Sequence, residues 1–262
     1  LQLTIGHVSY VASFSVMLFN IRTGEKNSFT RMKPLPLRNI PMPRNPEKPH
    51  VLEVKGKDYS MRFETHERER ILTVQADDRK LGTIDIDIVL RNDPDNEKMV
   101  IATPFFKRNQ FYLNYKENYY GLRGHVQFGD MSMQPGENDV ALLDWGRGVW
   151  PFEHEWFWGN GSGFVNGGRF GFNIGWGFGD LEYATENMFF WNGKAYKLDT
   201  LSVTRDVNDY MKPWHFTDNE GLFDFTMTPL YDRYTENKML IIDTHCHQIF
   251  GTYNGTAKLP DG

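Results

Sequence analysis

The chain has 262 residues, of which 15% are aromatic and 24% charged, and its formal net charge at pH 7 is −5. These proportions are typical of a folded protein and exclude extensive disorder. The acidic balance does not provide the basic surface of a duplex-binding protein, so no nucleic-acid partner is predicted. The single cysteine, Cys246, cannot form a disulfide within the chain, which excludes a disulfide scaffold.

The N-terminal region reads as strand. Residues 1–5 alternate, and the apolar stretch 8–19 contains three serines and is shorter than the about 20 residues of a transmembrane helix. We therefore predict a buried strand and no transmembrane segment. No signal peptide is recognisable, and we expect the natural chain to begin before Leu1. The sequence does not assign the compartment, although the cytoplasm is favoured.

Alternation with a period of two continues along the chain. Apolar and polar residues alternate at 59–63 and 84–88, as in strands with one buried face. Further short runs of this kind occupy 51–55, 71–76, 109–115, 119–128, 139–145, 169–176, 196–204, 221–228 and 239–250. The pairs Asn166-Gly167 and Asn192-Gly193 predict type I′ hairpin turns, in which both central residues need positive φ. The predicted fold class is all-β with little helix, as a sandwich or barrel.

Two segments of the N-terminal half are predicted to lie at the surface. Six of the prolines fall in residues 34–49, and since proline cannot donate to a β-ladder, we predict a strap over the surface. The alternating charges of residues 66–70 predict a solvated hairpin end.

Turn residues gather at 130–138, and all seven tryptophans follow this point. We therefore predict two β modules, residues 1–135 and 136–262. The sequence does not indicate the oligomeric state.

The densest aromatic block follows that boundary. Asp144 and Arg147 flank Gly146, and we expect the two to contact each other or the same backbone turn. Aromatic walls with a few polar groups are typical of a pocket for an apolar ligand, whereas the alternative is an aromatic core with a structural Asp–Arg pair. The predicted ring-bearing ligand contacts are Trp145, Trp150, Trp156, Trp158 and Trp176.

Polar candidates follow in GWGFGDLEYATEN, residues 175–187. Gly175, Gly177 and Gly179 alternate, which predicts a bare strand face open to a ligand or a neighbouring strand. Asn173, Glu186 and Asn187 are candidate pocket groups, and Glu186 could act as a general acid. The alternative is that these side chains hydrogen-bond loop backbone.

A polar strand face is predicted near the C-terminus, where Asp243, His245 and His247 alternate. Two histidines at this spacing can share a metal, but a polar strand face is the preferred interpretation, so no metal or other cofactor is predicted. His247 is retained as a candidate ligand contact. Cys246 points to the opposite face and is predicted to be a small core residue.

A set of motifs resembles the domain-of-unknown-function family 2804. The motifs are LTI at the start, LFNIRTGE, DWGRGVWP, WFWG, GFNIG, TEN, MKPW, FTMTP and HQIFGTYNG. At greater distance the chain is similar to the lipocalin-like carotenoid 1,2-hydratases, tocopherol-cyclase-like proteins and fungal Diels–Alderases. This resemblance implies two lipocalin-like antiparallel β-barrel or sandwich modules and a hydrophobic ligand.

The resulting hypothesis is a protein that binds an apolar small molecule in a tryptophan-lined pocket and could hydrate, cyclise or isomerise it. Asp144 and Glu186 are the predicted acids, and Arg147 and Asn173 would orient these acids or bind the ligand. The alternative is a non-catalytic carrier or interaction scaffold, so the sequence does not decide whether the protein is an enzyme.

Overall fold

In the computed structural model of the chain, residues 1–8, 11–34, 40–91, 93–239 and 242–260 are described. The chain divides into two compact units, each built from separate segments. Unit 1 comprises residues 1–20, 25–96 and 115–145, and unit 2 comprises residues 21–24, 97–114 and 146–262. The predicted module boundary at residue 135 stays a prediction.

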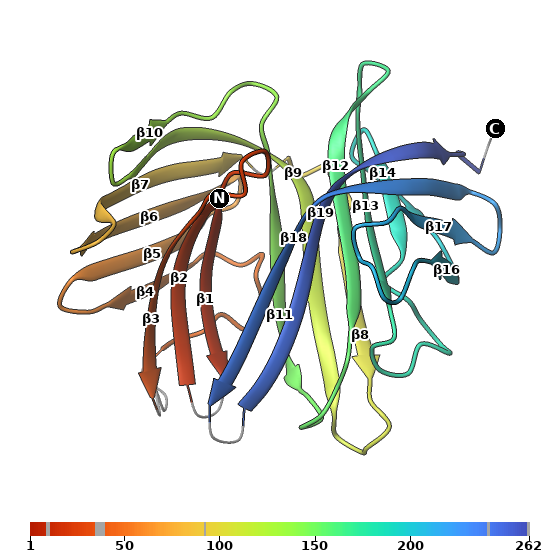
Figure 1. Ribbon diagram of the computed structural model, residues 1–262, viewed down its shortest axis with the longest axis horizontal. Helices are drawn as coiled ribbons and strands as arrows, with labels where there is room; N and C mark the ends of the chain where they lie inside the picture. Colours follow the sequence, from red (N-terminus) through yellow and green to blue (C-terminus); the bar gives the residue numbers. More distant parts are fainter. Residues whose placement is uncertain (9–10, 35–39, 92, 240–241, 261–262) are drawn as a thin grey trace. The chain divides into compact units, whose positions relative to one another are not determined.

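Strands β1 (Gln2–Val8), β2 (Val11–Phe19) and β3 (Lys26–Pro34) form an antiparallel sheet in unit 1 (Figure 1). A second sheet of eight strands has the order β10-β9-β7-β6-β5-β4, with β8 and β11 also paired to β9. Its strands are β4 (His50–Lys55), β5 (Tyr59–Thr65), β6 (Glu69–Asp78), β7 (Gly82–Arg91), β8 (Met99–Pro104), β9 (Phe111–Phe128), β10 (Met131–Met133) and β11 (Val140–Val149).

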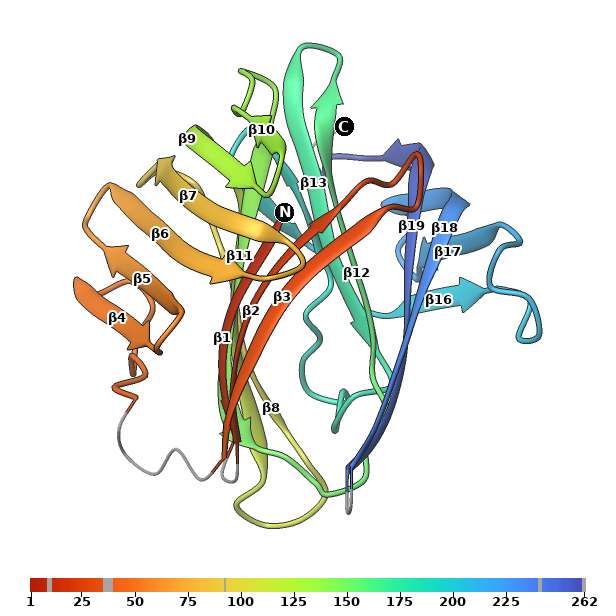
Figure 2. The ribbon, with the colours of Figure 1, turned by 60° about the vertical axis from the view of Figure 1, so that its left-hand side comes forward.

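The hydrophobic core of unit 1 lies between these sheets. Phe14 and Val16 of β2 pack with Met61 of β5 and Ile86 of β7, because the inward positions of each strand are apolar. Figure 2 shows β1–β3 crossing β6 and β7. Ile40, from the predicted proline-rich strap, joins this core; residues 40–49 form no strand, and residues 35–39 lie outside the described part.

Unit 2 contains two four-stranded antiparallel sheets (Figure 1). One consists of β12 (Phe157–Val165), β13 (Gly168–Trp176), β14 (Met188–Trp191) and β15 (Lys194–Lys197). The other consists of β16 (Leu201–Thr204), β17 (Trp214–Asp218), β18 (Phe223–Met239) and β19 (Ile242–Ala257). Phe172 of β13 contacts Phe223 of β18 and Tyr253 of β19, at ring distances of 5.4 and 4.8 Å. The core of unit 2 therefore lies between its two sheets.

The all-β prediction is confirmed, since the described residues contain only strands and irregular segments. Among the described strands, no sheet closes on itself, and the lipocalin-like detail stays a prediction. Both predicted type I′ turns are confirmed: Asn166, Gly167, Asn192 and Gly193 all have positive φ. Within the described part of the chain, no helix could span a membrane.

Strand β9 differs from the prediction of two strands, at 109–115 and 119–128. It runs unbroken from Phe111 to Phe128, with Tyr119 at φ 67° and Gly124 at φ 131°. Positive φ values let a strand change direction without ending. The polar residues between the two predicted strands therefore lie inside one long strand.

The predicted bare glycine face is also wrong in part. Strand β13 ends at Trp176, and Gly177 and Gly179 follow with φ of 72° and 74°. These two glycines serve the turns after the strand, because that backbone conformation is unfavourable for residues with a Cβ. Only Gly175 contributes to the strand face.

Replacing Phe172 with alanine should destabilise unit 2 by about 3–5 kcal/mol, because the side chain is fully buried against both sheets. Phe164→Ala, on the neighbouring strand, is the matched control, since Phe164 is half-exposed and its loss should cost about 0.5 kcal/mol or less. Denaturant unfolding of both variants measures the difference. Equal losses would contradict the position of this core.

Candidate functional site

The candidate site in unit 2 is built around Asn173, at the middle of β13. Its side chain has 0% exposure, so its amide must be satisfied inside the protein. The indole Nε1 of Trp158 donates to its Oδ1 at 2.7 Å. Its Nδ2 donates to the backbone oxygen of Glu186 at 2.9 Å and to Glu186 Oε2 at 3.0 Å. These bonds fix the carboxylate of Glu186 against the sheet.

The side chain of Glu186 lies against Gly175, where the absence of a side chain leaves room for it. A Cβ at Gly175 would stand 2.6 Å from Cδ and 2.7 Å from Cγ of Glu186, closer than real Cβ contacts. The predicted close approach to bare backbone is therefore found at Gly175, and the group that approaches is Glu186. A further bond comes from Asn114 of β9, whose Nδ2 donates to Glu186 Oε2 at 3.3 Å.

The residues on either side of Glu186 hold the loop to the protein. Asn187 is buried; its Oδ1 accepts from the backbone N–H of Gly175 at 2.8 Å, and its Nδ2 donates to the oxygen of Asp199 at 3.1 Å. Lys197 Nζ donates to Thr185 Oγ1 at 2.7 Å and to the oxygen of Asn187 at 3.0 Å. Burial lowers the pKa of Lys197 below its usual value. In the motif TEN, the bonds of Thr185 and Asn187 therefore position Glu186 between them. For Asn187, the alternative prediction of hydrogen bonds to loop backbone is confirmed.

A cluster of rings surrounds Phe178, three residues after Gly175. Ring centroids lie 4.9 Å away for Phe105, 5.6 Å for Tyr112 and 5.7 Å for His154. Trp156 lies 6.4 Å from Phe178, and Trp150 lies 5.4 Å from Tyr112. We call these six residues the Phe178 cluster. Trp156 is 51% exposed, so the cluster reaches the surface of unit 2.

The Phe178 cluster and the Glu186 carboxylate share strand β9. Tyr112 belongs to the cluster and Asn114 binds Glu186, and residues two apart on a strand lie on one face about 6–7 Å apart. Trp156, directly before β12, and Trp158 of β12 are also two residues apart in the chain. Unit 2 therefore contains a partly exposed group of aromatic rings and, two residues along β9 from one of them, the asparagine that binds a carboxylate. An apolar group held on rings near an acid or base is typical of a catalytic pocket.

The other predicted tryptophans have different positions. Trp176 packs on the core of unit 2, stacked on Phe157 at 5.2 Å. Its assignment as a core residue corresponds to the alternative interpretation of the aromatic block. Trp145 lies on β11 in unit 1.

Asp144 and Arg147 are both exposed on β11. Because they are three positions apart on one strand, their side chains point to opposite faces. Asp144 belongs to unit 1 and Arg147 to unit 2, whereas the Glu186 site belongs wholly to unit 2. The predicted pairing of Asp144 with Arg147 stays a prediction.

The predicted polar face of β19 lies on the β18–β19 hairpin, where each histidine has its own carboxylate. His247 Nδ1 lies 2.7 Å from Asp232 Oδ2, and its ring stacks on Tyr210 at 4.3 Å. His245 Nε2 lies 2.9 Å from Asp243 Oδ1. Cys246 is exposed, so its prediction as a core residue is wrong: both faces of the hairpin are open to solvent there.

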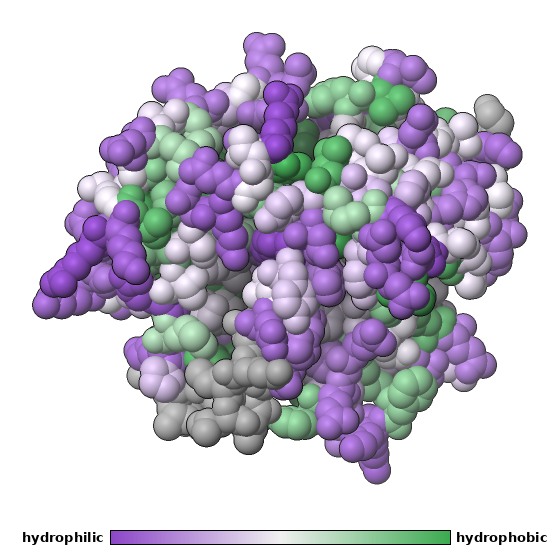
Figure 3. All heavy atoms as spheres, in the orientation of Figure 1, coloured by the Kyte–Doolittle hydropathy of each residue, from purple (hydrophilic) through white to green (hydrophobic). Residues whose placement is uncertain are grey.

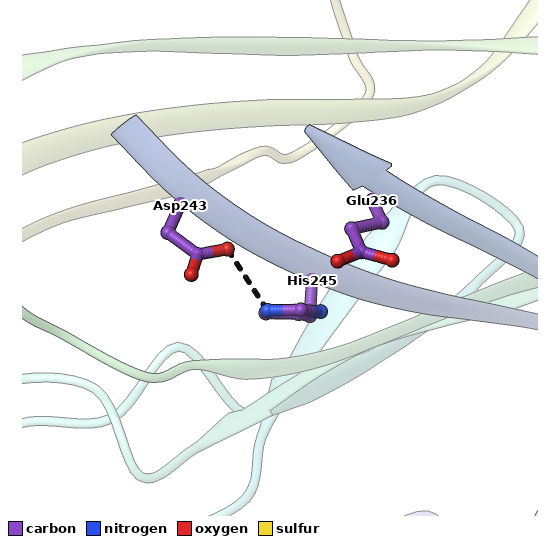
Figure 4. Close-up of side chains that lie close together, drawn as sticks. All are labelled: Glu236, Asp243 and His245. Atoms are coloured by element: carbon purple, nitrogen blue, oxygen red, sulfur yellow. Dashed lines mark ion pairs between the residues drawn. The ribbon is translucent and has the colours of Figure 1, made fainter. Parts of the chain in front are cut away.

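Glu236 completes a group that could hold a metal ion. Figure 4 shows its carboxylate on the same side of the hairpin as Asp243 and His245, and one ligand atom from each of the three lies within 4.8 Å of the others. All three side chains are exposed.

Sequence reasoning missed a buried ionisable cluster in unit 1. Glu117 is 1% exposed, and its Oε2 accepts from Tyr120 at 2.5 Å and from Tyr115 at 3.1 Å. Arg70 donates through Nε to the Tyr120 hydroxyl at 3.0 Å and through its other nitrogens to Thr65 Oγ1 and the oxygen of Pro46. Arg70 is buried, so its prediction as part of a solvated hairpin end is wrong.

A sequence signal for this cluster exists. Residues 114–120, NYKENYY, are all buried and contain neither glycine nor proline. A polar run without glycine or proline between two strand patterns indicates a continuous strand with polar groups inside. Asn114, which binds Glu186, begins the same run.

Two comparisons yield nothing: no curated protein and no solved structure matches the chain. The family described as Domain of unknown function (DUF2804) matches residues 1–262. The resemblance inferred from the motifs is confirmed, and the motif residues of WFWG, GFNIG and TEN are those that meet at Glu186.

The close approach of Glu186 to Gly175 predicts that Gly175→Ala destabilises the protein by about 1–3 kcal/mol through overpacking. Gly163→Ala, on the paired strand β12, is the matched control because nothing lies within 4 Å of its Cβ position. Removing the glutamate first, as Glu186→Ala, should reduce the cost of Gly175→Ala. Denaturant unfolding of the single and double variants measures this coupling, and strictly additive losses would contradict the contact.

The tyrosines of unit 1 predict an alkaline loss of stability. Burial, followed by the charge of Glu117, raises the pKa of Tyr115 above its usual 10.0, and burial also raises the pKa of Tyr120. The folded state then keeps protons that the unfolded state releases. The stabilisation is fully present below pH 10 and is lost as the pH rises through the folded values.

Denaturant unfolding at a series of pH values measures this dependence. The double variant Tyr115→Phe, Tyr120→Phe should lose less stability above pH 10 than the unmodified protein. Part of the loss should remain, because burial raises the pKa of Tyr253 in unit 2 to about 12. An equally steep decline in both proteins would contradict the assignment.

Proposed function

The chain belongs to the family DUF2804, whose description states no activity, and we propose that its unit 2 binds a hydrophobic small molecule on the Phe178 cluster. The observation that carries the proposal is the convergence of rings from separate segments on Phe178. One of these rings, Tyr112, lies two residues before Asn114, which binds the carboxylate of Glu186. Large aromatic side chains that remain exposed beside fixed polar groups are typical of ligand sites. The lipocalin-like architecture expected from the resemblance belongs to the same proposal.

Glu186 is the acid of the proposed site. Hydration, cyclisation and isomerisation of an apolar substrate can each begin with proton transfer from a positioned carboxylic acid, which contributes typically 10²–10⁴-fold. The hydrogen bonds from Asn173 and Asn114 both reach Oε2, and they would orient the carboxyl toward a substrate resting on the rings. Asp144, exposed on β11 of unit 1, is not part of this proposal.

Exposed aromatics favour a second function, an interaction surface for a larger partner. Phe106, Phe152 and Tyr183 are 86%, 73% and 80% exposed, respectively. Phe106 adjoins Phe105 in the chain, and Phe152 lies between Trp150 and His154, so two of these residues flank the Phe178 cluster. On the face shown in Figure 3, hydrophobic residues form small groups separated by hydrophilic ones. A few protruding rings of this kind could anchor a partner.

Titration with an apolar fluorescent probe tests the proposal. Tryptophan emission should be quenched saturably, and Trp156→Ala should weaken binding about tenfold or more, since burying an aromatic surface contributes about 1.5–3 kcal/mol. Phe164→Ala is the control, because Phe164 is an exposed ring at the far end of strand β12. Equal affinity for both variants, or no saturable quenching, would leave the interaction surface as the function.

A further inference from the structure

We infer that the ligand of unit 2 carries a hydrogen-bond donor, a hydroxyl or N–H group, at its polar end. The inference rests on the proposed function and deepens it by naming the chemical class of the ligand: an apolar alcohol, phenol or amine. An apolar carboxylate would be excluded.

Asn114 is the residue that determines the chemical class of the ligand. Its side chain is 1% exposed, and among the described residues its Oδ1 has no hydrogen-bond partner. Buried amide oxygens nearly always accept a bond from protein or water, so an acceptor left over at this place indicates a missing donor.

The orientation of this amide follows from its neighbour. Nδ2 lies 3.3 Å from Glu186 Oε2 and donates to it. Rotating the amide by half a turn would place Oδ1 against the carboxylate oxygen, where two acceptors would repel each other. The orphan atom is therefore the oxygen, and the group that completes it must be a donor.

The other polar groups of the site are already engaged with one another. The single N–H of the Trp158 indole donates to Asn173, and Asn173 Nδ2 donates to Glu186. What the site presents at its polar end is thus an amide oxygen beside a carboxylate. A hydroxyl or N–H group complements both, whereas a carboxylate ligand would bring acceptor against acceptor.

The position of Asn114 connects this requirement with the rings. Tyr112 of the Phe178 cluster lies two residues earlier on the same face of β9, about 6–7 Å away along the strand. A ligand with an aromatic or aliphatic body on the cluster and a polar group at one end would have to span this distance for that group to reach Oδ1. The same group could then receive or release a proton at Glu186.

Isothermal titration calorimetry with four naphthalenes tests the inference. The probes are naphthol, naphthylamine, methoxynaphthalene and naphthoate, substituted at the same ring position. Naphthol or naphthylamine should bind about five- to tenfold more tightly than methoxynaphthalene, the gain expected of one hydrogen bond. Naphthoate should bind most weakly. The stronger of the first two identifies hydroxyl or N–H as the preferred donor.

Asn114→Leu removes the orphan oxygen while keeping a side chain of similar size. In this variant the preference for naphthol over methoxynaphthalene should fall below about twofold, and Phe164→Ala should keep it. Equal affinities of the unmodified protein for naphthol, naphthylamine and methoxynaphthalene would overturn the inference and leave the proposed function standing. Tightest binding of naphthoate would also overturn it. Binding of none of the four would overturn the proposed function itself.

Discussion

The buried amide of Asn173 is the constraint on which the site in unit 2 depends. Because this amide has no exposed surface, all of its hydrogen bonds must be made within the protein. Its oxygen accepts from Trp158, and its nitrogen donates to Glu186. Satisfying the amide therefore fixes a tryptophan ring and a carboxylate in one step. The carboxylate can take this place because Gly175 has no side chain. A buried polar group thus specifies the geometry that an apolar core would leave undetermined.

Both units hold a carboxylate in place by hydrogen bonds from neighbouring side chains. In unit 1, Glu117 accepts hydrogen bonds from the hydroxyls of Tyr115 and Tyr120, and Arg70 donates to the hydroxyl of Tyr120. In unit 2, Glu186 is held by two asparagine amides. The buried carboxylate of Glu117 needs such partners, since desolvation of a charge is otherwise too costly. Strand β9 supplies residues to both clusters, which explains why its central run can be polar and still buried.

Features that depend on neighbouring residues in the chain, such as turns and short motifs, could be predicted from the sequence. Asn166-Gly167 makes its type I′ turn because only a few residues accept two positive φ values, and the motifs around Glu186 identified the residues that meet there. Long-range partners could not be predicted. Trp156 and Trp176 both belong to the aromatic region predicted to line a pocket, yet one is half-exposed and the other packs on a core. Arg70 looked like a surface charge because its partners are as many as 50 residues away.

The most direct test of this account is an NMR measurement of hydrogen exchange at the indole N–H groups of the seven tryptophans. The Trp158 indole proton, bonded to Asn173 Oδ1 at 2.7 Å, should exchange slowly, whereas that of the half-exposed Trp156 should exchange quickly. Adding naphthol should shift both signals and leave that of Trp214, which donates to the oxygen of Tyr210 in the core, unchanged. Fast exchange at Trp158, or signals of Trp156 and Trp158 that do not respond to any apolar ligand, would contradict the account.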